Sequence, residues 1–441
     1  MLRYLLLLGM AALYSIPVIA QTDANLSGYS DKTVALFAPG KHTNAWTLES
    51  AIRRVLEVAP ERRQSEAIIE MHQMALVQAG SWPNPTVDLR TDNRIGQLSS
   101  QGGIGLSQVA ISQPLPMHRL AYQRAAAETG LLAAQANSRG QYLLLEREAA
   151  HVFHAVQFAV AKHRLSRERL QLANSFAAGK IATTEDRIKR YLTPLEMGRL
   201  ALLQEEAHQA GILAERDLEN ALIAFKNLLA LTGKDVPETM PQILPEYPAT
   251  WAVLADKLNL HPTLEAARRE MESAEIGIKV AESRRYADPV LKLFHDRDFN
   301  NGAEMSVTGI GLGIELPLWS QNRSLEGQAR ADANASKSRY EVLHRDAETR
   351  LEQAYAQQVR LHDQTRLMEE HLIDPARKMF ELTRRSFAAG ESNVLALVDA
   401  SYAYFDTRTR YLELLHECAL ASAEVRFAAG LSVVDLKEYQ P

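Results

Sequence analysis

The sequence predicts a mixed α/β chain built from two repeats, each with one β-hairpin and long helices. Three observations predict this class. The same order of proline-punctuated segments occurs twice, short segments alternate between apolar and polar residues, and two long runs have helical periodicity with almost no proline. The 441 residues are 46% hydrophobic, which is far too apolar for a disordered polymer. The single cysteine, Cys418, has no intrachain partner for a disulfide.

Charge and motifs exclude several functional classes. The net charge is −5, from 49 basic and 54 acidic residues without a long basic block, so a nucleic-acid partner is not expected. No GxSxG, HExxH, P-loop or cysteine-pair motif is present, so the chain is not predicted to be an enzyme. His151 and His154 lie on one helical face, but such a pair more often packs or faces solvent than binds a metal. We therefore predict no metal site and no cofactor.

Residues 1–20 have the features of a signal peptide, followed by a linker over residues 21–46. Arg3 supplies the positive start, an apolar core follows, and Val18-Ile19-Ala20 places small residues before the cleavage point. A membrane anchor is the alternative, but the segment is short and is interrupted by Pro17. No later stretch reaches 18 uninterrupted apolar residues. The exported chain is then either soluble or an outer-membrane β-barrel, whose short strands leave no long apolar run.

The repeats are predicted at residues 47–233 and 251–430. A proline-rich connector over residues 234–250 separates them, and a tail covers residues 431–441. Each repeat begins with a short helix that meets a proline, Pro60 or Pro262, and continues through a helical segment to a second proline. Because the order, spacing and punctuation agree, we interpret the chain as a duplicated unit.

Each repeat contains a predicted hairpin, at about residues 86–113 and about residues 290–316. The four predicted strands are Thr86–Asn93, Ile104–Gln113, Val290–Arg297 and Val307–Leu316. In the last strand Ile310, Leu312, Ile314 and Leu316 share one face, and Gly309, Gly311, Gly313 and Glu315 share the other. An apolar outer face with a small or polar inner face is typical of a membrane barrel. Alternation alone equally allows a half-buried hairpin on a soluble core.

Long helices are predicted from about His118 to Arg190 and from about Arg323 to Ala389, where Pro375 interrupts the second. One apolar stripe is expected in the second helix: Tyr340, Leu343, Ala347, Leu351, Ala354, Leu361, Met368, Leu372, Ala376 and Met379. After each reversal a shorter helix follows, about Leu195–Leu231 and Val394–Ala428. Two short helices placed end to end would have about the length of one long helix. Four strands are too few to close a barrel, so a closed structure needs several identical chains around an axis.

Specific runs of the sequence resemble TolC-type outer-membrane efflux proteins, and most of all their heavy-metal (cobalt–zinc–cadmium) branch. The resemblance is carried by Thr47-Leu48-Glu49-Ser50-Ala51, Ala59-Pro60-Glu61, Gln78-Ala79-Gly80-Ser81-Trp82-Pro83-Asn84-Pro85, Gly390, Leu397-Val398-Asp399-Ala400 and Tyr404. It implies a trimeric membrane protein of mixed α/β class. Each chain would give four strands to a shared twelve-stranded outer-membrane barrel and long helices to a periplasmic α-barrel. Where the family usually has Asn-Pro, this chain has Ala59-Pro60, which matters little if proline begins the helix.

The resemblance implies a passive outer-membrane exit duct of a tripartite efflux system that exports heavy-metal cations. Its implied partners are two further copies of the chain, a periplasmic adaptor (membrane fusion protein), a proton-driven inner-membrane pump and outer-membrane lipid. Drug efflux, type I secretion and a soluble periplasmic coiled-coil scaffold are the alternatives. A conduit needs no bond-making residues, which agrees with the missing catalytic motifs.

The resemblance also assigns two sites. The helical reversals are the expected adaptor-docking tip, with Leu192, Thr193, Pro194, Leu195, Gly390 and Ser392 as its residues. The first-half reversal could instead lie near Gly179, because Ser175-Phe-Ala-Ala-Gly179 repeats as Ser386-Phe-Ala-Ala-Gly390. Asp399 is the expected pore gate, where the family has two acids and this chain has Ala396 and Asp399. The alternative is that Asp399 is a solvated helix residue that pairs with Arg408.

Overall fold

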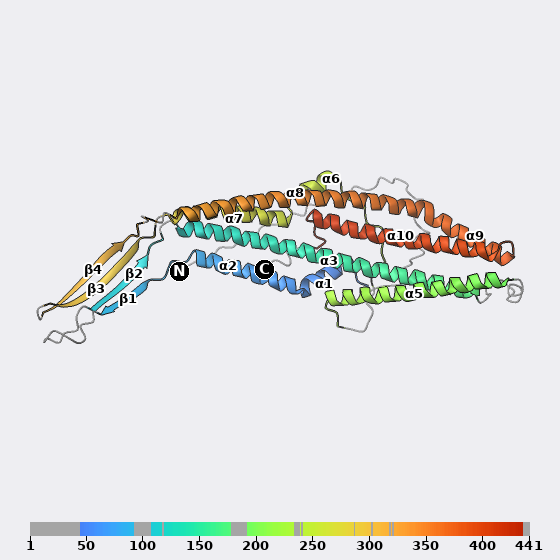
Figure 1. Ribbon diagram of the computed structural model, residues 1–441, viewed down its shortest axis with the longest axis horizontal. Coiled ribbons are helices and arrows are strands. Elements are labelled where there is room, and N and C mark those ends of the chain that lie inside the picture. Colours follow the sequence, from blue (N-terminus) through green and yellow to red (C-terminus); the bar gives the residue numbers. More distant parts are fainter. Residues whose placement is uncertain are drawn as a thin grey trace, which may run out of the picture. The chain divides into compact units, whose positions relative to one another are not determined.

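Long helices and one antiparallel sheet make up the described part of the chain (Figure 1). The computed structural model describes residues 45–91, 107–116, 119–177, 192–232, 239, 241–285, 287–300, 303–316, 319 and 322–434. All of them belong to the unit Asn44–Pro441, and the other unit is Met1–Thr43. The predicted signal peptide, nearly all of the linker, residues 234–238 and 240 of the connector and residues 435–441 of the tail lie outside the described residues.

The order of elements in the first half recurs in the second half. The first half contains α1 (Leu48–Val58), α2 (Pro60–Ala79), β1 (Thr86–Thr91), β2 (Ser107–Pro114), α3 (Arg119–Ala177) and α5 (Pro194–Leu228). The second half contains α6 (Trp251–Leu258), α7 (Pro262–Ser283), β3 (Val290–Asn300), β4 (Ala303–Gly313), α8 (Arg323–Met368), the π-helical turn η2 (Glu369–Ile373), α9 (Asp374–Ala389) and α10 (Val394–Ala428). The exact limits of the two repeats remain predictions.

Prolines and caps determine where the helices begin. Pro60 and Pro262 occupy the first positions of α2 and α7, where a missing amide hydrogen costs no helical hydrogen bond. Pro60 therefore begins the helix as predicted, while Ala59 at the N-cap makes no side-chain capping hydrogen bond. Thr47 begins α1 with a capping box, in which its side chain and that of Ser50 each accept a hydrogen bond from the other's backbone amide.

Each long helix lies beside two shorter helices. α3 packs against α2 and then α5, and α8 packs against α7 and then α10 (Figure 1). α3 also contacts α7 and α10, which joins the two halves. The buried side chains form three clusters along the helices, centred on residues such as Phe153, Val394 and Leu351. Small alanine side chains in these clusters allow the helices to pack closely side by side.

The four strands form one sheet in the order β1-β2-β3-β4, so the hairpins of the two halves join through the β2–β3 pair. Residues directly opposite one another share a face. One face carries eight exposed apolar side chains: Val87, Leu89, Val109, Ile111, Leu291, Leu293, Ile310 and Leu312. The other face carries Asp88, Arg90, Lys292 and the glycines of β4. Gly309 is required there, because a Cβ would lie 2.5 Å from Cζ of Phe294.

The last strand ends earlier than the sequence predicted. β4 covers Ala303–Gly313, so Ile314 and Leu316 lie beyond it. Gly313 pairs with Val290, the first residue of β3, and the preceding residue is a proline, Pro289, which has no amide hydrogen to continue the ladder. The described part of the first strand, β1, ends at Thr91, and the last two residues of the predicted strand lie outside the described residues.

The predicted apolar stripe of the second long helix is wrong beyond Met368. Leu351, Ala354 and Met368 are buried as expected, but Leu372 and Met379 are exposed. The π turn η2 comes between α8 and α9 and adds one residue to the helical repeat. The buried position therefore moves from Met379 to Phe380. Pro375 lies directly after this turn, so the helix continues through the proline by widening one turn.

Candidate functional site

The second-half reversal is a tight turn between α9 and α10. Gly390 has a φ of 80°, a left-handed conformation that glycine adopts without strain. The amides of Gly390 and Glu391 donate to the carbonyls of Phe387 (3.0 Å) and Ser386 (2.8 Å), which closes the end of α9. Asn393 then begins α10, its side chain accepting a hydrogen bond from the Ala396 amide at 2.9 Å. Ser392, whose Oγ lies 3.5 Å from the Thr383 carbonyl oxygen, is half-buried inside this turn.

The first-half reversal ends at a capping box. The Thr193 hydroxyl accepts from the Glu196 amide, and the Glu196 carboxylate accepts from the Thr193 amide at 2.8 Å. These hydrogen bonds hold the pKa of Glu196 below its usual value. Pro194 occupies the first helical position of α5, and Leu195 beside it is exposed. Gly179, the alternative position for this reversal, lies outside the described residues.

The structure brings the two predicted reversals together. Leu192 packs against a buried cluster from α3, α5, α9 and α10 that we call the tip cluster: Ala173, Phe176, Leu200, Leu203, Ala207, Phe380, Phe387, Val394, Leu397, Val398 and Ala400. The Val394 amide also contributes to the lowered pKa of Glu196, which places the start of α10 beside the start of α5. The adaptor-docking assignment of these residues remains a proposal.

Asp399 projects from α10 into solvent, less than two turns after Val394. Ala396, the second position that carries an acid in the family, is also exposed. Toward the described residues, the Asp399 carboxylate makes no hydrogen bond and no ion pair. Arg408, the alternative partner, binds Glu168 of α3 at 2.6 Å and the Tyr404 hydroxyl at 3.1 Å instead. The alternative Asp399–Arg408 pair is therefore absent from the described contacts.

Two polar ties join α10 to its neighbours near Asp399. The Tyr402 hydroxyl donates to the Glu206 carboxylate of α5, and the guanidinium of Arg169 on α3 lies 5.3 Å from the centre of the Tyr402 ring. Burial and the Glu206 carboxylate raise the pKa of Tyr402 to about 12, so it remains a donor at neutral pH. The second tie is the Arg408–Glu168 pair. The sequence analysis missed both ties.

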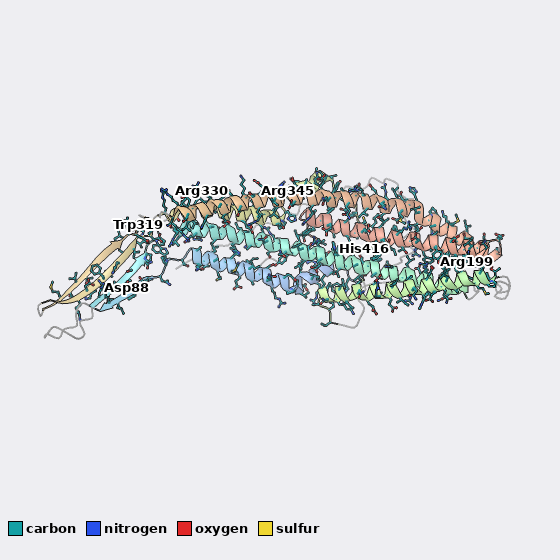
Figure 2. All side chains as sticks on the ribbon, viewed as in Figure 1. Asp88, Arg199, Trp319, Arg330, Arg345 and His416 are labelled. Atoms are coloured by element: carbon teal, nitrogen blue, oxygen red, sulfur yellow. The ribbon has the colours of Figure 1, made fainter. Side chains whose placement is uncertain are left out.

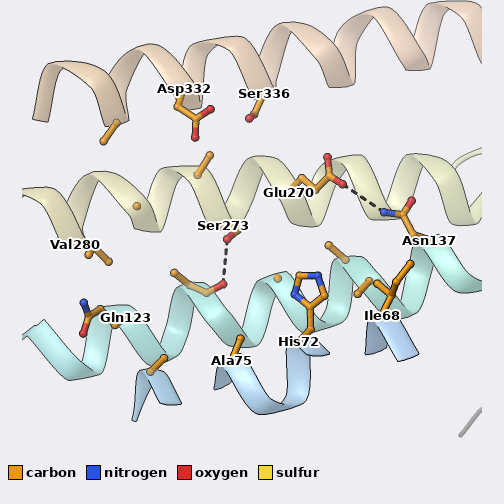
Figure 3. Close-up of a pocket in the computed structure, with 18 of the residues that line it drawn as sticks. Ile68, His72, Ala75, Gln123, Asn137, Glu270, Ser273, Val280, Asp332 and Ser336 are labelled. Carbon is orange, nitrogen blue, oxygen red and sulfur yellow. Dashed lines mark hydrogen bonds between the residues drawn. The ribbon is translucent and has the colours of Figure 1, made fainter. Parts of the chain in front are cut away.

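A groove of about 1470 Å³ runs between α2, α3, α7 and α8 (Figure 3). Much of its wall is small, from alanine, glycine and serine residues such as Ala75, Gly130 and Gly277. Its ionisable side chains are Glu61, His72, Glu270, Arg284, Asp332 and Arg339. Glu270 accepts a hydrogen bond from Asn137 at 3.4 Å and lies 3.9 Å from Arg339. The groove thus has a smooth, polar wall with a slight excess of acids.

Three histidines lie between α3 and α10, away from the tip cluster. His151 lies 3.1 Å from Glu424, His154 bonds Gln157 at 2.8 Å, and His416 stacks on Phe158 with ring centres 4.8 Å apart (Figure 2). Burial, with the nearby His154 and His151, lowers the pKa of His416 to about 4. Across the described part of the chain, no group of three or more His, Cys, Asp or Glu side chains is arranged to hold a metal ion.

Acidification is expected to weaken the packing of α10 on α3 through His416. An imidazole whose pKa falls from 6.5 in the unfolded chain to about 4 in the folded chain favours folding fully above pH 6.5, and this contribution disappears as the pH falls toward 4. The loss is on the order of 2–3 kcal/mol per chain. Thermal unfolding of the solubilised protein from pH 7 to pH 4.5 measures it. His416→Phe, which keeps the ring stack, should reduce the pH dependence.

The matched control for this prediction is His208→Phe, because the His208 side chain is 55% exposed. This variant should show the same pH dependence as the original chain. An equal loss of melting temperature in the His416 variant and the original chain would show that other groups cause the acid sensitivity.

Comparison with known proteins identifies the fold and the family. Residues 253–431 match the model of the family described as outer membrane efflux protein. The cobalt-zinc-cadmium resistance protein CzcC of Cupriavidus metallidurans is 26% identical over 433 residues, which cover 96% of this chain and 99% of that protein. The similarity to the outer membrane efflux protein family thus covers residues 253–431, and the similarity to CzcC extends over nearly the whole chain.

Two further comparisons agree with this similarity. The alkaline protease secretion protein AprF of Pseudomonas aeruginosa is 26% identical to this efflux protein over 349 residues, 74% of this chain and 69% of AprF. The crystal structure of the open state of the Neisseria gonorrhoeae MtrE outer membrane channel superposes with a TM-score of 0.69 at 19% identity, over 87% of this chain and 89% of that one. The predicted resemblance to outer-membrane efflux proteins and the combination of helical and β parts are thus confirmed.

In the described residues of this efflux protein, none of the helices is both long and apolar enough to cross a membrane. The named relatives are resistance, secretion and channel proteins rather than enzymes.

Proposed function

We propose that this efflux protein is the passive exit duct of a tripartite efflux system, working as a homotrimer. Its strands close a twelve-stranded barrel in the outer membrane, and its helices extend as an α-barrel into the periplasm. A periplasmic adaptor docks at the helical reversals and connects the duct to an inner-membrane pump. That pump, driven by protons, supplies the energy, and the duct itself catalyses no reaction.

The sheet is the observation that carries this proposal. Its outer strands β1 and β4 each pair on one side only within the described residues, and one face carries exposed apolar side chains on all four strands. In water such a sheet would expose both an aggregation-prone apolar face and two edges with unpaired backbone hydrogen-bonding groups. Pairing β4 of one chain with β1 of the next satisfies the edges, and three chains supply twelve strands. The apolar face then meets lipid. A soluble scaffold leaves this face unexplained.

The groove between α2, α3, α7 and α8 supports the duct. Three copies of this groove around one axis would line a continuous lumen with small and polar side chains. A wall without large apolar or strongly basic patches suits hydrated ions. The slight excess of acids, with Glu61 and Asp332 beside the Glu270–Arg339 pair, favours cations over anions.

Heavy-metal cations are the cargo that we propose, because the similarity to the cobalt-zinc-cadmium resistance protein covers both halves of the chain. The similarity to the alkaline protease secretion protein favours a second candidate, a type I secretion duct for a polypeptide. It covers a smaller part of both proteins. Drug efflux is the third candidate function.

Deletion of the gene in its own host tests the function. We expect sensitivity to cobalt, zinc and cadmium salts to rise and sensitivity to organic drugs to stay unchanged. The membrane fraction should contain a trimer band that heating converts to the monomer. Unchanged metal tolerance with loss of a secreted polypeptide would replace metal export by secretion. Recovery of the protein in the aqueous fraction would overturn the outer-membrane duct altogether.

A further inference from the structure

The four helix–strand connections lie in one layer, which we call the junction layer. It consists of residues 80–85, 115–116, 119–124, 284–285, 287–289, 319 and 322–323 of the described chain. Hydrogen bonds cross it from one connection to the next: Gln113 Nε2 donates to the Pro83 carbonyl at 2.9 Å, and the Leu115 amide donates to the Pro289 carbonyl at 2.7 Å. The Asn322 side chain donates to the Arg284 carbonyl. These contacts link the four connections into one layer.

Four exposed arginines of the junction layer have no side-chain partner among the described residues, and one of them, Arg284, lines the groove. The guanidiniums of the other three, Arg124, Arg285 and Arg323, make no hydrogen bond or ion pair with the described residues. Other arginines nearby are paired: Arg119 binds Asp288 at 2.7 Å, and Arg330, labelled in Figure 2, binds Glu326 at 2.7 Å. Asp288 and Glu326 are thus already engaged. The three remaining guanidiniums come from α3, the end of α7 and the start of α8.

Two exposed tryptophans flank the same layer. Trp82 is 61% exposed and precedes β1, and Trp319 is 93% exposed and follows β4 (Figure 2). A tryptophan combines a large apolar ring with one hydrogen-bond donor, so it prefers the boundary between hydrocarbon and water. The apolar face of the sheet begins directly beyond these residues. Val87 is the second residue of β1, and Leu312 is the second-last residue of β4.

We propose that the junction layer is a docking surface for anionic phospholipid headgroups in the periplasmic leaflet of the outer membrane. Arg124, Arg285 and Arg323 bind the headgroup phosphates as charge-assisted hydrogen-bond donors, and Trp82 and Trp319 lie at the edge of the hydrocarbon. The inference rests on the proposed placement of the sheet in that membrane. It adds a specific lipid class as a ligand and fixes the depth at which the duct lies.

Lipid binding by the purified trimer tests the docking surface. The delipidated trimer in a neutral detergent is titrated with dioleoyl phosphatidylglycerol or dioleoyl phosphatidylcholine, and thermal stability reports binding. We expect stabilisation by phosphatidylglycerol and little by phosphatidylcholine. The triple variant Arg124→Gln, Arg285→Gln, Arg323→Gln should lose roughly tenfold or more in apparent affinity for phosphatidylglycerol, because each basic residue at an anionic surface contributes about fivefold.

The matched control removes three exposed arginines far from the junction layer: Arg164→Gln, Arg167→Gln and Arg384→Gln. This variant has the same change of net charge and should bind phosphatidylglycerol as the original trimer does. Equal phosphatidylglycerol affinity in the original trimer and the junction variant would overturn the proposal. So would equal stabilisation by inorganic phosphate, because a free anion would then suffice.

The proposed function is tested separately with the same proteins. Original and junction-variant trimers should both insert into neutral planar bilayers and conduct ions. Failure of the original chain to insert would overturn the duct and the docking surface together. Normal conductance with no preference for the anionic lipid would overturn the docking surface alone.

Discussion

Replacing Ser392 with tryptophan or Gly390 with valine is expected to abolish export, while folded trimers still reach the outer membrane. Both residues lie in the turn between α9 and α10, at the helical end beside Leu192 and the start of α5. A wide side chain there would keep an adaptor from approaching the backbone. We expect metal tolerance to fall to that of the deletion strain, and chemical crosslinking to the adaptor to be lost.

The two substitutions separate docking from folding. Gly390 has a φ of 80° and no neighbouring atom within 4 Å of the place where a Cβ would stand, so valine there costs about 1–2 kcal/mol of backbone strain but meets no clash. Asparagine tolerates the left-handed conformation, so the variant Gly390→Asn tests the effect of an added side chain with little backbone strain. Gly211→Val in the middle of α5, another glycine with open space, is the control for an added side chain. Normal export by the Ser392→Trp variant would show that the adaptor docks elsewhere.

The strands could be predicted from the sequence because a period of two residues is a local property. The sequence pattern placed Ile310 and Leu312 on one face of the last strand and Gly309 and Gly311 on the other. The pairing register shows the same two faces. The strand end could not be predicted in the same way. It depends on which residue of β3 stands opposite, and the partner of Gly313 is Val290, directly after a proline. The alternation within one strand does not predict which residues of the neighbouring strand it pairs with.

The long helices show where periodicity stops being informative. A stripe drawn with a constant helical repeat follows the buried face only to Met368, because the π turn of Glu369–Ile373 adds one residue. Pro375 was the one available signal, and it indicated a disturbance without its direction. The sequence allowed either a kink or a widened turn. The burial of Phe380 within the tip cluster favours the widened turn.

The candidate site divides in the same way. The reversal at Gly390 could be predicted because glycine is the residue that a left-handed helix end requires. The ties from Tyr402 to Glu206 and from Arg408 to Glu168 could not, since each joins residues about 200 positions apart, on different helices. Single tyrosines and arginines on a helix carry no signal of a partner that far along the chain. Only the packing of α10 between α3 and α5 brings them together.

Asp399→Asn is expected to lower the cation selectivity of the trimer and its block by multivalent cations. Under threefold symmetry, Asp399 supplies three carboxylates to the mouth of the duct. In the single chain its carboxylate is exposed, and Arg408 is engaged with Glu168, so its charge is available to the lumen. At ~8 Å in water each carboxylate attracts a monovalent cation by about 0.5 kcal/mol, and three together change cation occupancy by roughly tenfold. A divalent cation feels twice this attraction.

Single-channel conductance of the purified trimer in a planar bilayer measures both effects. Asp406→Asn on the same helix is the matched control, because Asp406 already pairs with Arg410 at 2.9 Å and should not contribute to the pore. Ala396→Asp restores the second acidic position of the family and should strengthen selectivity and block, since Ala396 is exposed one turn before Asp399. The gate assignment predicts opposite changes for the two variants at neighbouring positions. If neither variant alters selectivity or block, Asp399 faces the outer wall of the helical barrel rather than its lumen.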